Sequence, residues 1–121
     1  MGVYNTLTRV LLNNIFSSLE GRIEPDQYII MGAQRDAWGP GAVKAGVGTA
    51  ILLELARTFS NMVQNGFHPR RSLLFVSWDA GDFGNVGATE WLEVGTDSSL
   101  SSSLPLSLFL GLSLERGMHL L

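Results

Sequence analysis

YIIMGAQRDAWGPGAVKAGVG, residues 28–48, is the stretch around which the chain is organised. Its first four residues are an apolar run with two isoleucines in the middle, which is too short for a helix and favours a buried strand. A glycine and an alanine then lead the backbone out of the strand, and Gln34, Arg35 and Asp36 place polar side chains at its carboxyl end. In open α/β sheets, binding sites are built at that end of the strands. The stretch therefore predicts an α/β fold and the place where a site would lie.

A helix and a second strand follow. Apolar residues recur at helical spacing on one face of residues 47–64, with polar side chains opposite, and Asn65-Gly66 ends the pattern with a glycine suited to the left-handed conformation. Residues 72–77 are a second apolar run. Strand, helix and strand with buried runs make a βαβ unit, so the strands at 27–33 and 72–77 are expected to be parallel neighbours.

Two further elements flank this unit, while residues 1–13 carry no pattern that we can interpret. Residues 14–20 are predicted to form a strand. The turn around Pro25-Asp26 should let this strand pair with the next one as an antiparallel hairpin. Residues 85–93 are predicted to form a short helix. The expected fold class is α/β, with a sheet made of a β-hairpin plus a βαβ unit.

Composition excludes several classes of protein. The 121 residues are 45% hydrophobic and 16% charged, which is typical of a globular domain. A net charge of −3 gives no basic footprint, so we expect no nucleic acid partner and no membrane contact by this chain itself. Cysteine is absent, which removes disulfides and thiolate metal sites. We see no signal peptide and no apolar run of the roughly 18 residues that a transmembrane segment needs.

The glycine-rich loop invites comparison with phosphate-binding loops, but the patterns fail. Gly46-Val47-Gly48 would need a third glycine where Ile51 stands. The spacing from Gly41 to Gly46 matches a P-loop, but the Lys-Ser/Thr pair that should follow is replaced by Val47-Gly48. We therefore expect a loop that needs tight backbone packing rather than a nucleotide site.

Carboxylates follow both strands of the βαβ unit: Asp36 the first, Asp79 and Asp82 the second. Parallel strands would bring them into one cleft, where such a cluster can hold a divalent metal. A zinc hydrolase site needs about three nitrogen or carboxylate ligands and a general base. Neither histidine fits, because His68 is expected at the opposite end of the strands and His119 lies near the end of the chain. The alternative, which the residues favour, is a polar rim in which Asp79 and Asp36 are satisfied by backbone N–H groups or by Arg35.

Several separated motifs, in the same order, resemble the protease-like domain of transferrin receptors. They are Glu20-Gly21-Arg22, Glu24-Pro25-Asp26, Gly32-Ala33-Gln34-Arg35-Asp36-Ala37-Trp38-Gly39-Pro40-Gly41, Gly46-Val47-Gly48-Thr49-Ala50, Ser77-Trp78-Asp79-Ala80-Gly81-Asp82-Phe83-Gly84 and Gly87-Ala88-Thr89-Glu90-Trp91-Leu92-Glu93. The resemblance covers residues 15–93. That family is similar to zinc exopeptidases of the glutamate carboxypeptidase type, so the resemblance implies a partial zinc-exopeptidase-like sheet.

The resemblance also implies where the zinc site of the exopeptidases would fall. Carried over by position, the histidine ligand is Gln34, the aspartate that bridges two zinc ions is Lys44, the general base is Gly81 and the adjacent ligand is Asp82. A neutral amide is a poor zinc ligand, an ammonium repels cations, and glycine has no side chain to accept a proton. We therefore expect a degenerate peptidase-like domain that is not an enzyme, with no catalytic residue, no metal and no cofactor.

Residues 94–121 depart from the resemblance, since Val94-Gly95 follows Glu93 where the family has Gly-Tyr. The remainder is Gly/Ser/Thr-rich and then leucine- and serine-rich. We expect a partial peptidase-like domain at 1–93 and an unrelated tail at 94–121 that is disordered or an artefact of the gene model, such as a retained intron.

The resemblance implies a non-catalytic fragment of a receptor ectodomain. The parent family implies transferrin and a second copy of the receptor as partners, a role in iron uptake and iron homeostasis, and a type II membrane protein at the cell surface. One alternative is an active zinc exopeptidase of the glutamate carboxypeptidase type. A further alternative is a truncated product with no function of its own.

Overall fold

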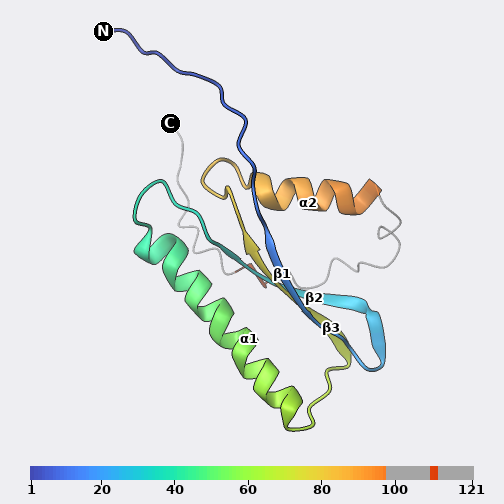
Figure 1. The fold of residues 1–121 in the computed structure, drawn as a ribbon. Helices are drawn as coiled ribbons and strands as arrows, with labels where there is room; N and C mark the ends of the chain where they lie inside the picture. Colours follow the sequence, from blue (N-terminus) through green and yellow to red (C-terminus); the bar gives the residue numbers. More distant parts are fainter. Residues whose placement is uncertain (98–109, 112–121) are drawn as a thin grey trace.

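A computed structural model describes residues 1–97 and 110–111 of the chain (Figure 1). The elements in order are β1 (Ile15–Leu19), β2 (Glu24–Gln34), the π-helical turn η1 (Ala42–Val47), α1 (Gly48–Gln64), β3 (Arg71–Trp78), α2 (Val86–Asp97) and β4 (Leu110–Gly111). The α/β class is confirmed, as are the three strands and two helices expected before residue 94. The segment expected to be a loop between β2 and the first helix is partly helical, since its second half forms η1.

The strand order is β1-β3-β2-β4, which confirms the βαβ unit and corrects the hairpin. β2 and β3 are parallel neighbours, with Ile30 opposite Leu74. β1 runs antiparallel but pairs with β3, not with β2. The cause lies in the connection after β1, where the N–H groups of residues 22–24 donate to the carbonyls of Pro69 and Arg70. These bonds fasten the turn to the start of β3, so β3 takes the place beside β1.

The two faces of the sheet carry different cores, and in Figure 1 the two helices lie on opposite sides of the sheet. On one face, the apolar stripe of α1 packs onto alternate residues of β3. The members of this cluster are Ala33, Leu52, Leu73 and Phe75, with Leu19, Ile29, Met31, Leu55, Ala56 and Phe59 packed against it. On the other face, Phe16, Trp78 and Trp91 form an aromatic cluster with ring centroids 5.5–6.1 Å apart. A side chain at Gly32 would meet the indole Nε1 of Trp78 at 2.3 Å, so this glycine makes room for the cluster.

The expected boundary after Glu93 falls within α2, which continues to Asp97. Further along, Leu110 and Gly111 pair in parallel with Met31 and Gly32 of β2. Residues 98–109 and 112–121, on which most of the predicted tail falls, lie outside the described residues. The division of the chain at residue 93 therefore stays a prediction.

Candidate functional site

Parallel pairing brings the carboxyl ends of β2 and β3 to the same edge of the sheet. Gln34 and Trp78, the last residues of the two strands, are partners in the register. The N–H of Arg35 then donates to the carbonyl oxygen of Trp78 at 2.9 Å. The loops that follow the two strands therefore start side by side, as the sequence predicts.

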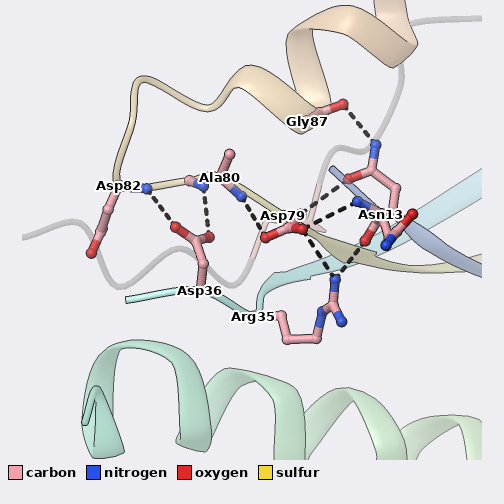
Figure 2. Close-up of polar contacts among 9 residues, drawn as sticks. Asn13, Arg35, Asp36, Asp79, Ala80, Asp82 and Gly87 are labelled. Atoms are coloured by element: carbon pink, nitrogen blue, oxygen red, sulfur yellow. Dashed lines mark hydrogen bonds and ion pairs between the residues drawn. The ribbon is translucent and has the colours of Figure 1, made fainter. Parts of the chain in front are cut away.

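Asp36 ties these two loops together. Its Oδ1 accepts a hydrogen bond from the N–H of Gly81 at 2.6 Å, and its Oδ2 accepts one from the N–H of Asp82 at 3.0 Å (Figure 2). Both carboxylate oxygens are thereby engaged by backbone donors. This is the arrangement of the predicted polar rim, in which the carboxylate fixes backbone rather than a ligand.

Asp82 is the centre of a second cluster, and its side chain is only 4% exposed. Its Oδ1 accepts a hydrogen bond from Gln34 Nε2 at 2.9 Å and forms an ion pair with Lys44 Nζ. Its Oδ2 accepts the N–H of Trp38 at 2.9 Å. The Lys44 ammonium, and next the amide of Gln34, lower the pKa of Asp82 below its usual range. Two of the positions singled out by the resemblance, Gln34 and Lys44, therefore both contact a third, Asp82.

Gly81, the fourth position, lies against Gln34. A Cβ at Gly81 would stand 2.4 Å from Cδ of Gln34 and 2.7 Å from its Cγ and Oε1. Gln34 in turn donates to the carbonyl oxygen of Asp36 at 2.9 Å, which fixes the amide in this place. The glutamine side chain thus fills the space that a side chain at 81 would take.

Lys44 reaches Asp82 because η1 begins directly after the loop from β2. Gly41, at the start of η1, has a φ of 61°, and a Cβ there would meet the Cβ of Ala37 at 2.3 Å. The N–H groups of Ala45 and Gly46 both donate to the carbonyl oxygen of Gly41, at 2.9 and 3.1 Å. In a phosphate-binding loop, backbone N–H groups would point at a ligand. Here these two N–H groups bond within the turn, which fits the expected tightly packed loop.

Asp79 belongs to a third network, which anchors the segment before β1. Its Oδ2 accepts the N–H of Asn13 at 3.2 Å and lies 3.5 Å from Arg35 Nη2, and its Oδ1 accepts the N–H of Ala80 at 2.9 Å (Figure 2). The N–H of Asn13, ahead of that of Ala80 and the charge of Arg35, lowers the pKa of Asp79 despite partial burial. Asn14 adds a clamp, since its side chain accepts the N–H of Asp79 and donates to the carbonyl oxygen of Gly87, at 3.0 and 2.8 Å.

The three aspartates predicted as a possible metal cluster therefore lie near one another but serve different partners. Within residues 1–97 and 110–111, no three His, Cys, Asp or Glu side chains gather closely enough to share a metal ion. His68 precedes β3, at the end of the sheet away from these loops. His119 lies outside the described residues.

Sequence reasoning missed four residues at this edge: Asn13, Asn14, Trp38 and Phe83. The rings of Trp38 and Phe83 stack, with centroids 5.3 Å apart and planes at 21°. Asn13 and Asn14 fasten the N-terminal segment to the loop after β3. The sequence signal that could have revealed them is the pair of adjacent asparagines at the start of a strand. Asparagine side chains readily form hydrogen bonds with backbone N–H and carbonyl groups that have no partner in the sheet.

Comparison with known proteins identifies the family to which the chain belongs. Residues 14–109 match the family model described as peptidase family M28. The chain belongs to peptidase family M28. Transferrin receptor protein 2 of Homo sapiens is 71% identical over 91 residues, which is 75% of this chain and 11% of that relative. Transferrin receptor protein 2 of Mus musculus is 74% identical over 82 residues, which is 68% of this chain and 10% of that relative. Transferrin receptor protein 1 of Gallus gallus is 58% identical over 94 residues, which is 77% of this chain and 12% of that relative.

The resemblance to transferrin receptors is therefore confirmed. The chain spans about a tenth of the length of the curated relatives it matches. None of the helices in the described part of the chain combines the length and the apolar character that crossing a membrane requires.

Proposed function

We propose that the chain is a non-catalytic part of a transferrin-receptor-like ectodomain. The contact that carries the proposal is the one between Lys44 and Asp82, because it places an ammonium at the carboxylate that would otherwise remain able to bind metal. The identity of 58–74% to transferrin receptors supports the receptor assignment.

The donors around Asp82 do not fit a zinc ion. A zinc site needs several lone pairs directed at one point. Here Gln34 presents its N–H₂ group to Asp82, and Trp38 presents its backbone N–H. At Gly81, the position of the general base, there is no side chain that could accept a proton from water. We therefore derive no hydrolytic step for this site.

The first experiment is a thermal melt of the purified chain, followed by circular dichroism, with Zn²⁺ and then with EDTA. We expect a cooperative melt at the same temperature in both, because a ligand raises the melting temperature only if it binds the folded state. A rise with Zn²⁺ that EDTA reverses would contradict the proposal. If such a rise occurred and Asp82→Asn abolished it, the metal would be placed at Asp82 and the exopeptidase alternative would be favoured.

We further propose that the chain acts within a longer cell-surface receptor, where the family implies transferrin, a homodimer partner and a role in iron uptake and homeostasis. The names of the relatives and the tenth of their length that the chain spans support this. The test is binding of iron-loaded transferrin to cells that display a receptor-length protein carrying this stretch. Cells without that protein are the control, and equal binding to both would contradict the assignment.

Two alternatives predict other results. Membership of peptidase family M28 favours a zinc exopeptidase, which predicts zinc-dependent release of terminal residues from peptides. A truncated product without function predicts that the chain shows no cooperative melt with or without Zn²⁺.

A further inference from the structure

The ion pair between Lys44 and Asp82 joins two segments that are far apart in the chain. Lys44 lies in η1 and Asp82 in the loop after β3. The lysine side chain is 58% exposed, whereas that of Asp82 is 4% exposed, so a largely solvent-accessible ammonium contacts an enclosed carboxylate. Lys44 is the only cationic side chain that contacts this carboxylate among the residues that the structure describes.

Asp82 also holds Trp38 at two points. Its carboxylate accepts the backbone N–H of Trp38 at 2.9 Å, and its carbonyl oxygen accepts the indole Nε1–H at 3.2 Å. The ring held in this way stacks on Phe83. Trp38 and Phe83 are 77% and 66% exposed, so burial does not fix them. Their placement depends on Asp82, and the placement of Asp82 depends on the groups around its carboxylate.

We propose that Lys44 is a positioning residue that acts as a built-in cation: its ammonium neutralises the enclosed carboxylate of Asp82 and thereby fixes the exposed Trp38–Phe83 pair. An ammonium suits this place better than a metal ion, because the other neighbours of the carboxylate are N–H donors rather than lone pairs. The site should therefore accept a free alkylammonium ion when the lysine stem is removed. This inference does not depend on what the receptor binds, so failure of the transferrin experiment leaves it standing. A zinc-dependent rise in melting temperature that Asp82→Asn abolishes would overturn it, because Lys44 would then not be the cation at this carboxylate.

The test is Lys44→Ala, followed by the indole N–H resonance of Trp38 in ¹H–¹⁵N spectra. Trp38→Phe identifies that resonance among those of the three tryptophans. We expect the resonance to move towards the free-indole position and the melting temperature to fall by at most a few degrees, because solvent partly screens an ion pair whose lysine is 58% exposed. Propylammonium replaces the three missing methylenes and the amine. It should restore the Trp38 resonance and the melting temperature in a saturable manner, because it would bind only the folded state. Tetramethylammonium at the same concentration has no N–H donor and should restore neither.

Matched variants separate this role from a general effect of charge. Arg57→Ala removes one positive charge from an exposed pair with Glu54 at 3.7 Å and should leave the Trp38 resonance in place. Lys44→Met keeps most of the aliphatic stem and should behave as Lys44→Ala, whereas Lys44→Arg should keep the resonance near its original position. An unchanged Trp38 resonance in Lys44→Ala or Lys44→Met would overturn the proposal, and so would equal rescue by the two ammonium ions.

Discussion

Gly81 and Gln34 show how one missing side chain is linked to the conformation of its neighbour. The glutamine side chain occupies the space beside Gly81 and is held there by bonds to Asp82 and to the carbonyl oxygen of Asp36. In Gly81→Ala, the new methyl group would force the glutamine out and break those bonds. We expect unfolding free energy to fall by about 1–3 kcal/mol, the usual cost of overpacking. Urea denaturation of the two proteins measures the difference.

The same reasoning supplies the controls for Gly81→Ala. Gly39→Ala adds a methyl group where nothing lies within 4 Å, and it should change stability little. Gln34→Ala removes the obstacle, so Gly81→Ala made in that background should cost less than in the wild type. Equal costs in the two backgrounds would show that the glutamine does not fill the space.

The sequence predicted the location of the site and the kind of groups that bind Asp36 and Asp79, but not the contacts of Asp82. Polar residues after two buried strands placed the site at one edge of the sheet, because parallel strands end together. Which donor meets which carboxylate depends on the paths of two loops. Lys44 reaches Asp82 only because η1 coils as it does, and no local pattern in the sequence encodes that approach.

At the scale of elements, the βαβ unit could be predicted because its signals are local, a periodic helix between two apolar runs. The position of β1 could not. Consecutive strands usually pair, which favoured a hairpin. The N–H groups of residues 22–24 instead bond to carbonyls more than forty residues along the chain. Such long-range partners are invisible in a single sequence.

The starts of β2 and β3 are joined by a cluster of charges that should respond to pH. Glu24 accepts hydrogen bonds from Arg70 at 3.0 and 3.2 Å and from Arg71 at 2.9 Å, which lowers the pKa of Glu24 from 4.5 to about 2. A lowered pKa in the folded state adds stability above pH 4.5, and this contribution is lost as pH falls towards 2. We expect wild type to exceed Glu24→Gln in unfolding free energy at pH 6 and the difference to shrink on acidification. Urea titrations at low salt measure it.

Removing the arginines tests whether they cause this pH dependence. In an Arg70→Ala, Arg71→Ala background, Glu24→Gln should change stability by the same amount at every pH. Arg57→Ala removes a positive charge from a distant exposed pair, and in that background Glu24→Gln should have the same pH-dependent effect as in wild type. All three side chains of the cluster are partly exposed, so the stability that Glu24 gains from the two arginines should also decrease in high salt. A pH dependence that survives loss of both arginines would contradict the assignment.

At the scale of the whole molecule, the described part of the chain leaves apolar surface uncovered beside β1. A shallow groove of about 210 Å³ lies between β1 and α1, and its lining includes Leu19, Phe59 and Phe75. In residues 1–97 and 110–111, β1 pairs only with β3, so its other edge keeps free backbone donors and acceptors. The sequence of β1, IFSSL, contains no charge or proline that would discourage another strand from pairing there.

We therefore expect the isolated chain to associate as its concentration rises, which light scattering after size-exclusion chromatography would measure. Ile15→Lys places a charge on the edge strand at a side chain that is 53% exposed, and it should lower the apparent mass without unfolding the chain. Leu7→Lys makes a comparable change at a fully exposed residue outside any strand and should have a much smaller effect. Equal effects of the two variants would mean that general hydrophobicity, rather than the open edge of β1, drives association. A monomeric mass at every concentration would mean that this edge is already protected.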